Sequence, residues 1–331
     1  MWGNGKAGEK DLEVHRALDH RARCRYCRVR HRRPRGDRDR QWLLAFGNQV
    51  SGQVTKTGDS ISSWFSKANG TGGTGGGNAG GGGGGTDSRI EELKEKDPAD
   101  WTLDDQKAVA EDIGKKGNSS ELYAKAKAAM DAGTEWSITL TDGKTLTYRI
   151  IGIDHDDLAD GSGKAGLTFE ATSKTFGKQR INANDTNVGG WKVSELRGRL
   201  NSGDLWSLLP TDFTGKIRPV TKMTDNQGGG THGQPTATID KVFIISTTEF
   251  FGDLHSDGVQ YEYYKDKGVT LKNYSMNEAI DYHWTRSVNE TYTVPGYEPF
   301  SNRFCYTMSY GPGRGVGDPS KTENVFPVWC F

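Results

Sequence analysis

The sequence predicts an α+β protein with short antiparallel strands, two or more helices and long irregular loops. Three observations carry this prediction. Apolar residues recur at helical spacing over residues 87–133, strict alternation replaces that spacing from residue 135, and glycine-rich loops separate the short apolar segments that follow. Segregated helical and strand segments of this kind are typical of the α+β class.

Composition bounds the size and the partners of the protein. The 331 residues suffice for one or two domains with hydrophobic cores, although only 33% are hydrophobic and the mean hydropathy is −0.74. Residues 1–40 hold 13 Lys and Arg against 6 Asp and Glu in a chain that is neutral as a whole. This basic excess is local, so we expect no specific nucleic-acid partner. No apolar run approaches the roughly 20 residues of a membrane span, and no signal peptide is visible.

Distinct segments precede the main domain. Residues 1–40 lack apolar periodicity and are expected to be disordered, with a nucleic-acid-binding arm as the alternative. Cys24 and Cys27 form a C-x2-C pair without the second pair that a zinc site normally needs. Residues 41–66 are predicted to form an amphipathic helical segment, through which the chain self-associates or attaches to a virion. Residues 67–86 are a glycine-rich flexible linker.

A helical lead-in is predicted for residues 87–133. Thr102 is expected to cap the second helix in a capping box. Ser119 or Ser120 is expected to cap the next helix, which ends at Gly133.

The main domain is predicted to span residues 134–331. Alternating apolar residues on both sides of Asp142 and Gly143 predict a hairpin over residues 135–153. Further predicted elements are a helix over 191–210 with Leu196 and Leu200 inward, a strand over 240–247 and a strand that contains HWTRSV, 283–288.

The stretch DHDDLADGSGKAGLTF, residues 154–169, has the residue types of a metal or phosphate loop. As a phosphate loop it fails, because Leu158 replaces the first glycine and Ala165 replaces the hydroxyl residue that would bind magnesium. As an EF-hand loop it fails at Leu158 in both frames. We expect a loop between two strands whose glycines (Gly161, Gly163 and Gly166) allow positive φ, and no cofactor. Three carboxylates remain candidates for a structural calcium ion: Asp156, Asp157 and Asp160.

Patterns for catalysis are weak. The sequence has no H-E-x-x-H and no G-x-S-x-G, so no catalytic residue is predicted. Cys305 and Cys330 lie among aromatic residues and are expected to be buried free thiols, with a disulfide as the alternative in an oxidising compartment. Arg286 lies within a predicted strand beside Trp284, where we expect it to be buried and ion-paired, either structurally or facing a ligand.

An ordered set of motifs resembles a known family. The motifs are YRIIGIDHDDLADGSGKAGLTFEA, NDTNVGGWKVSELRGRLNSGDLWSLLP, IRPVTKMT, TIDKVFIISTTEFFG, HWTRSV and VFPVWCF. Together they resemble the bacterial and phage domain of unknown function 6273 over roughly residues 134–331. That family is distantly similar to the C-type-lectin-like and formylglycine-generating-enzyme-like fold. The resemblance implies a loop-rich, C-type-lectin-like domain enclosed by the strand WTRS (284–287) and a terminal strand VFPV (325–328). Thr285 and Phe326 depart from the family pattern. We expect these two departures to affect the local packing and not the fold.

The enzymatic and sugar-binding sites of that fold are not implied. Formylglycine-generating enzymes bind copper through two closely spaced cysteines, whereas Cys305 and Cys330 lie 25 positions apart. Calcium-dependent lectins use E-P-N or Q-P-D together with W-N-D. Here Glu298 and Pro299 are followed by Phe300, and no W-N-D occurs.

Residues 288–324 have the composition of a binding surface, because tyrosines supply rigid contact area and Ser, Gly and Asn supply adaptable hydrogen bonds. An ordinary aromatic-rich loop is the alternative. The expected ligand-binding residues are Tyr292, Tyr297, Asn302, Tyr306, Tyr310 and Arg314. Lectin-like domains of phage receptor-binding proteins, including those diversified by retroelements, resemble this arrangement. We therefore expect a non-enzymatic module, virion-associated or on a bacterial surface, that binds a cell-surface protein or glycan. The alternatives are a degenerate formylglycine-generating-type enzyme and a structural domain without a ligand.

Overall fold

The computed structural model describes residues 84–331, apart from residue 232 and the segments 253–256, 274–281, 290–300 and 308–313. The chain divides into two units, Met1–Ala79 and Gly80–Phe331, and every described residue belongs to the second. The expectations for residues 1–40 and 41–66, and for the linker up to residue 83, lie outside the described residues.

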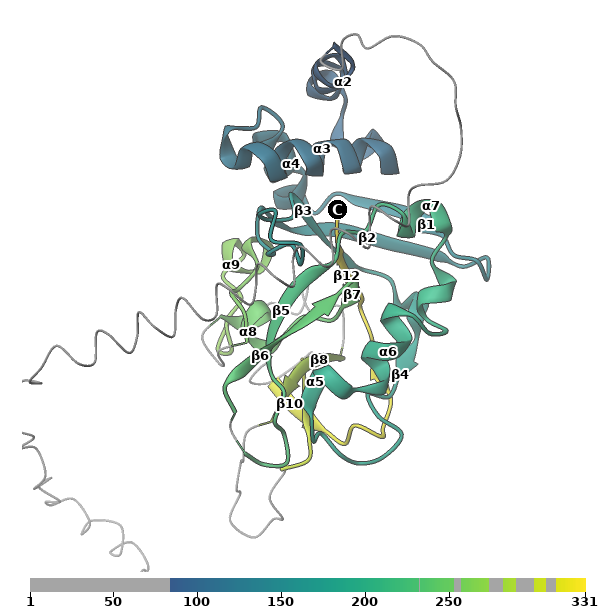
Figure 1. The fold of residues 1–331 in the computed structure, drawn as a ribbon, viewed down its shortest axis with the longest axis vertical. Coiled ribbons are helices and arrows are strands. Elements are labelled where there is room, and N and C mark those ends of the chain that lie inside the picture. Colours follow the sequence, from purple (N-terminus) through teal and green to yellow (C-terminus); the bar gives the residue numbers. More distant parts are fainter. Residues whose placement is uncertain (1–83, 232, 253–256, 274–281, 290–300, 308–313) are drawn as a thin grey trace, which may run out of the picture. The chain divides into compact units, whose positions relative to one another are not determined.

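Helices α2, α3 and α4 occupy the start of the described chain (Figure 1). Their bounds are Gly84–Glu95, Leu103–Lys116 and Tyr123–Ala132, with 3-10 turns η1 at Pro98–Asp100 and η2 at Gly117–Ser119. The capping box predicted at Thr102 is present, and Gly133 ends α4 in a left-handed conformation as predicted. The start of α4 is later than predicted, because the Ser120 hydroxyl donates to Asp112 (2.5 Å) and accepts from the Leu122 amide (3.1 Å).

A five-stranded antiparallel sheet follows these helices. Its strands, in spatial order, are β1 Glu135–Thr139, β2 Thr145–Ile153, β3 Leu167–Ala171, β12 Val328–Cys330 and β7 Val242–Phe243. The hairpin predicted around Gly143 is confirmed, and Gly143 has φ +82°. The last strand of the chain lies between strands from the start and the middle of the domain, and α3 and α4 pack against β3 and β2 (Figure 1).

Two further sheets complete the fold. The second sheet has the order β10 Arg314–Gly317, β9 Phe304–Thr307, β8 His283–Val288, β11 Glu323–Asn324 and β4 Lys178–Gln179, with β8 and β11 parallel. The third is a hairpin of β5 Val220–Asp225 and β6 Pro235–Asp240. The described residues thus form a mixed α+β domain of small, mainly antiparallel sheets, as the sequence predicts.

Short helices connect these strands. They are η3 Lys174–Phe176, α5 Gly190–Val193, α6 Glu195–Asn201, η4 Trp206–Leu208, α7 Thr211–Thr214, α8 Thr247–Phe251 and α9 Glu262–Asp266. The single helix predicted over 191–210 is wrong. Ser194 has ψ 142° and caps α6 by accepting from the Arg197 amide at 3.2 Å, so it interrupts the helix, although Leu196 and Leu200 are buried as predicted.

Two predicted strands differ from the observed ones. The strand predicted over 240–247 is only Val242–Phe243, because Ser246 and Glu249 form a capping box that starts α8. The terminal strand runs over Val328–Cys330 rather than 325–328.

Aromatic side chains fill the centre of the first sheet. Trp329 of β12 lies 5.2 Å from the Tyr148 ring and 5.1 Å from the Phe213 ring, in edge-to-face arrangements. Trp191 and Trp284 are also fully buried. None of the helices in the described part of the chain has the length and hydrophobicity needed to cross a lipid bilayer.

The loop after β2 carries its glycines for two different reasons. Gly161 and Gly163 have φ of +74° and +124°, which confirms the positive φ predicted for them. Gly166 does not have positive φ, and here the prediction is wrong. A Cβ at Gly166 would lie 1.9 Å from the Ala110 carbonyl oxygen, so this glycine allows α3 to pack against the loop.

Candidate functional site

The structure describes the side chains of two of the six predicted ligand-binding residues, Asn302 and Tyr306. Arg314 begins β10 and pairs with Thr307 of β9. The other three lie outside the described residues: Tyr292, Tyr297 and Tyr310. The described part of the predicted surface is therefore the edge of the second sheet formed by β9 and β10.

Tyr306 is half-buried and is held by aromatic neighbours. Its ring lies 6.0 Å from the Trp284 ring in an edge-to-face arrangement and 5.8 Å from the Tyr282 ring. A Cβ on its cross-strand partner Gly315 would lie 2.3 Å from the Tyr306 ring, so the ring lies directly over that glycine. The Tyr306 side chain is thus supported from β8 and from β10.

Asn302 helps to attach the start of β9 to the loop before α5. The Asn302 side-chain amide donates to the Asp185 carbonyl oxygen at 3.1 Å, and the neighbouring Arg303 forms an ion pair with the Asp185 carboxylate at 2.6 Å. The Asn187 side chain donates to the Arg303 carbonyl oxygen at 2.8 Å. These contacts join residues that are more than a hundred positions apart in the sequence, and they give this loop a defined position.

Arg286 on β8 lies in the core beneath this sheet, buried and ion-paired as predicted. Both of its terminal nitrogens bind the Glu249 carboxylate of α8, one of them at 2.8 Å. Its Nε donates to Thr224 Oγ1 at 2.9 Å, and its remaining N–H groups donate to backbone carbonyls, including that of Asp257 at 2.8 Å. All five N–H donors of the guanidinium group can therefore be engaged inside the protein.

Lys222 of β5 extends this network to the first sheet. Its ammonium group forms ion pairs with Glu249 and Asp156 and lies 4.5 Å from the centre of the Phe243 ring. Asp156 also accepts from Thr168 at 2.7 Å and from the Tyr261 hydroxyl at 3.0 Å. We call Asp156, Lys222, Glu249 and Arg286 the buried ionic network.

The buried ionic network holds its groups in their charged forms. Burial alone would raise the pKa of Asp156, but the charge of Lys222 outweighs it and the pKa lies well below the ordinary value. Burial likewise opposes ionisation of Glu249, yet Arg286 and Lys222 lower its pKa. Burial would lower the pKa of Lys222, and its two carboxylate neighbours raise it. Two positive and two negative charges balance, so the network is suited to joining the sheets rather than to exchanging protons at neutral pH.

A cavity of about 350 Å³ opens beside the network. The residues that line it include three members of the network, Asp156, Lys222 and Glu249, together with His155 and Glu262. His155 Nδ1 lies 3.0 Å from a Glu262 carboxylate oxygen. Burial lowers the pKa of His155, but the hydrogen bond to Glu262 and the charge of Asp156 outweigh it, so the pKa is raised.

The three carboxylates considered for calcium are not brought together as a site. Asp156 is buried in the network, whereas Asp157 is exposed and pairs with Lys164 at 3.1 Å. Asp160 binds Arg218 at 2.8 Å and accepts from the Ser162 hydroxyl at 2.6 Å. In the part of the chain that the structure describes, no group of three His, Cys, Asp or Glu side chains is arranged to hold a metal ion. Each of the three carboxylates instead has its own cationic partner: Lys222 for Asp156, Lys164 for Asp157 and Arg218 for Asp160.

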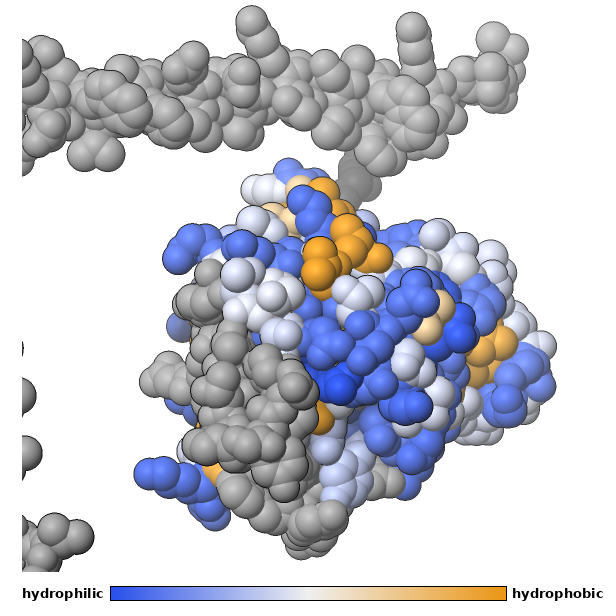
Figure 2. Space-filling view, turned by 90° about the horizontal axis from the view of Figure 1, so that it is seen from below, coloured by the Kyte–Doolittle hydropathy of each residue, from blue (hydrophilic) through white to orange (hydrophobic). Residues whose placement is uncertain are grey.

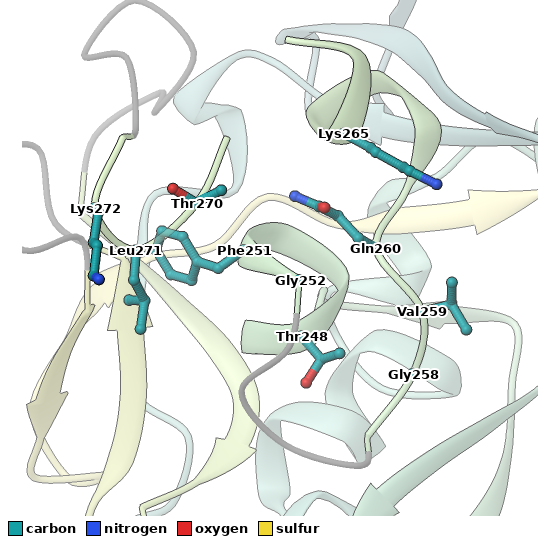
Figure 3. A pocket seen from close by; sticks show the side chains of 10 residues that line it. All are labelled: Thr248, Phe251, Gly252, Gly258, Val259, Gln260, Lys265, Thr270, Leu271 and Lys272. Carbon is teal, nitrogen blue, oxygen red and sulfur yellow. The ribbon is translucent and has the colours of Figure 1, made fainter. Parts of the chain in front are cut away.

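A larger cavity of about 700 Å³ lies beside α8 and α9 (Figure 3). Phe251 and Leu271 give it apolar walls, while Lys265 and Lys272 lie at opposite ends of the view. The Gln260 amide is used within the protein, since it donates to the Phe250 and Val269 carbonyls at 2.9 and 2.7 Å.

Cys305 and Cys330 are buried thiols that are not joined in a disulfide, as predicted. Cys305 lies on β9 of the second sheet and Cys330 on β12 of the first sheet. Cys330 Sγ lies 3.3 Å from Thr168 Oγ1, and burial raises the pKa of the Cys330 thiol well above its ordinary value. These thiols do not form the disulfide considered from the sequence.

Sequence reasoning identified Arg286 but missed its partners. One signal was present for Glu249, because S-x-x-E at Ser246 is a capping-box pattern. For Lys222 the signal was its place in β5, because alternate residues of a strand share a face and both Val220 and Thr224 are buried. Neither signal indicates that the Glu249 and Lys222 side chains are in contact.

Comparison with known proteins gives one match. Residues 162–321 match the model of a family described as Domain of unknown function (DUF6273), a narrower range than the predicted 134–331. No curated protein matches the chain, and no solved structure matches it. The resemblance to the C-type-lectin-like fold therefore stays a prediction. The match confirms the family that the sequence motifs resemble, and the chain contains a domain that belongs to the DUF6273 family.

Proposed function

We propose that this chain is a non-enzymatic binding module, displayed on a phage particle or a bacterial surface, that contacts a cell-surface protein or glycan through residues 288–324. The observation that carries the proposal is the support of Tyr306. Its half-buried ring is fixed between Trp284, Tyr282 and Gly315, so little side-chain freedom remains to be lost when a ligand binds.

The scaffold beneath this surface also favours binding. The buried ionic network joins β8 to α8 and β5 through Arg286, Glu249 and Lys222. Its paired, charged groups make the support of the sheet rigid, and rigid elements position binding residues more accurately than free loops do. The coloured part of the face in Figure 2 is largely hydrophilic, with small separate hydrophobic groups.

The enzymatic alternative has less support. A formylglycine-generating-type mechanism depends on two reactive cysteines, and here Cys305 and Cys330 are buried on different sheets. The raised pKa of Cys330 disfavours the thiolate that would act as a nucleophile or copper ligand.

A binding screen with the full chain tests the proposal. A glycan array and a panel of bacterial cells are probed with the wild type and with a variant in which Tyr292, Tyr297, Tyr306 and Tyr310 are all changed to Ala. We expect at least a tenfold loss of binding, and Tyr306→Ala alone should account for part of it. Equal binding by the variant would exclude this surface, and absence of binding to any array or cell would favour a structural role.

A matched variant controls for loss of fold. Tyr123→Ala removes another half-buried tyrosine, on α4, at a position outside residues 288–324. It should leave binding unchanged. Circular dichroism and thermal unfolding of each variant separate a local loss of contact from unfolding.

A further inference from the structure

The cavity of about 350 Å³ beside the buried ionic network has the size of a small-molecule site. Such sites range over roughly 300 to 1,000 Å³. Its described lining comes from the loop after β2, from β5, from α8 and from α9 with the segment that leads into it. None of these residues belongs to the surface at 288–324. The cavity is therefore a separate candidate site, and the groups that the protein leaves unpaired there set its ligand.

The charges around this cavity do not balance. Five carboxylates and three basic side chains line it, and within the buried ionic network the charges cancel. Asp157 pairs with Lys164 at 3.1 Å, and Glu262 pairs with His155 at 3.0 Å. The Asp154 carboxylate is left over, because its side chain has no hydrogen-bond or ion-pair partner within the described chain. The cavity thus offers one uncompensated negative charge.

The surroundings of Asp154 disfavour its ionised form. Burial raises the pKa of Asp154, the charge of Lys164 offsets only part of this rise, and the charge of Glu262 adds to it. A cation in contact with the Asp154 carboxylate would supply the compensation that the described residues do not.

The His155 side chain supplies a second unpaired group. It is only 8% exposed, its ring lies 4.3 Å from the Tyr261 ring, and its Nδ1 is held by Glu262. Its Nε2 has no partner among the described residues but keeps accessible surface, and His155 lines the cavity. Although burial opposes protonation, the hydrogen bond to Glu262 raises the pKa of His155 and favours a proton on each ring nitrogen. Nε2 is then a donor for a ligand oxygen.

Two apolar side chains lie at the same cavity. Met223 of β5 and Val259 both line it, and they are 41% and 69% exposed. Each can lose apolar surface to a side chain of the ligand, which is favourable.

These unpaired groups select the chemistry of a ligand. An anion would be repelled by the charge of Asp154, and a neutral ligand would leave that charge uncompensated. An alkylammonium ion without an acceptor would leave His155 Nε2 unpaired. The N-terminus of a peptide carries a single ammonium charge, a carbonyl oxygen on the next carbon but one, and a side chain between them. A free amino acid adds a carboxylate, which Asp154 and Glu262 would repel.

We propose that this cavity binds the free N-terminus of a peptide or protein partner. The ammonium group binds the Asp154 carboxylate, the first carbonyl oxygen accepts from His155 Nε2, and the first side chain packs on Met223 and Val259. Capture of an N-terminal amine is a recurring mode of peptide recognition. The site shares no residue with the surface at 288–324, so either proposal can fail without the other.

The Met223 methyl group gives a direct test. The full chain is labelled with 13C at its methionine methyl groups, and the Met223 resonance is assigned from its loss in Met223→Leu. We expect Leu-Gly-Gly amide to shift this resonance in a saturable way and to leave the Met130 resonance unchanged, since Met130 is buried on α4 and does not line the cavity. N-acetyl-Leu-Gly-Gly amide lacks the ammonium group and should bind about tenfold more weakly or worse. Leucine, which adds a carboxylate, and isopentylamine, which lacks the carbonyl, should also bind more weakly than the peptide.

Variants separate the site from general effects on the fold. Asp154→Asn removes the charge and keeps the shape, and asparagine tolerates the φ of +53° found at this position. It should weaken the binding of Leu-Gly-Gly amide about tenfold without changing the thermal unfolding midpoint. Asp204→Asn is the matched control, because it removes an exposed carboxylate that does not line the cavity, and its affinity should equal that of the wild type.

Three results would overturn the proposal. The first is a Met223 resonance that no probe shifts. The second is equally tight binding of the acetylated peptide, of leucine or of isopentylamine. The third is an Asp154→Asn variant that binds Leu-Gly-Gly amide as well as the wild type does.

Discussion

Arg286 on β8 and Glu249 on α8 form a two-point ion pair that is fully buried at the junction of the sheets. Lys222 binds the same carboxylate, and through Asp156 it reaches Thr168 on β3. A charged pair in the interior is unfavourable unless its partners are both present and hydrogen-bonded. The arrangement of the three sheets thus depends on each member of the buried ionic network.

Arg286→Met should destabilise the domain by about 3 to 5 kcal/mol, because it leaves Glu249 buried with one cation fewer. The measurement is the free energy of unfolding from guanidinium titration, followed by tryptophan fluorescence. Arg199→Ala is the matched control. It removes a largely exposed pair with Asp204, where about 0 to 1 kcal/mol is expected. Similar losses in the two variants would contradict a stabilising role for the buried pair.

Asp156→Asn should reduce the acid sensitivity of the domain. The pKa of Asp156 is lowered in the folded state, so its ionised form stabilises the protein above the ordinary pKa of 3.8, and this stabilisation is lost as the pH falls through the lower folded value. Between pH 5 and about 2, the free energy of unfolding should therefore fall less steeply in Asp156→Asn, from a lower starting value. Asp157 is its exposed neighbour, and Asp157→Asn should keep the wild-type dependence of the unfolding free energy on pH. If the two variants showed the same dependence on pH, the result would argue against the role of Asp156 in the network.

Gly166→Ala should destabilise the domain by roughly 1 to 3 kcal/mol, because its Cβ would overlap the Ala110 carbonyl and push α3 from the loop. Gly198→Ala offers the opposite case. Gly198 lies in α6 with no atom within 4 Å of an added Cβ, and the change should stabilise by about 0.5 to 1 kcal/mol. We expect the thermal unfolding midpoint to fall in Gly166→Ala and to rise in Gly198→Ala. A shift in the same direction in both variants would be inconsistent with the packing of α3 on Gly166.

Cys305 and Cys330 should resist alkylation in the native protein, since both are buried and burial raises the pKa of Cys330. Iodoacetamide is applied with and without guanidinium, and peptide mass mapping identifies each modified cysteine. We expect both residues to be modified only after unfolding. Rapid native modification of Cys330, or a Cys305–Cys330 disulfide in the map, would contradict the structure.

Local signals account for the parts of the fold that could be predicted. The capping box at Thr102, the turn at Gly143 and the helix end at Gly133 depend on residues within one or two turns of each other, so the sequence alone was sufficient. The helix over 191–210 was mispredicted because its apolar spacing is helical on both sides of Ser194, while the backbone there is extended.

The sequence by itself determined the α+β class, the family and the burial of Arg286, since these follow from periodicity, ordered motifs and residue type. Only the tertiary structure decided what Arg286 binds, where Lys222 points and which donor remains unpaired at Trp101. Glu249 is 37 positions from Arg286, and Asp156 is 66 positions from Lys222. No local pattern encodes such distances, because charged partners in a core are selected by the packing of whole strands and helices against one another.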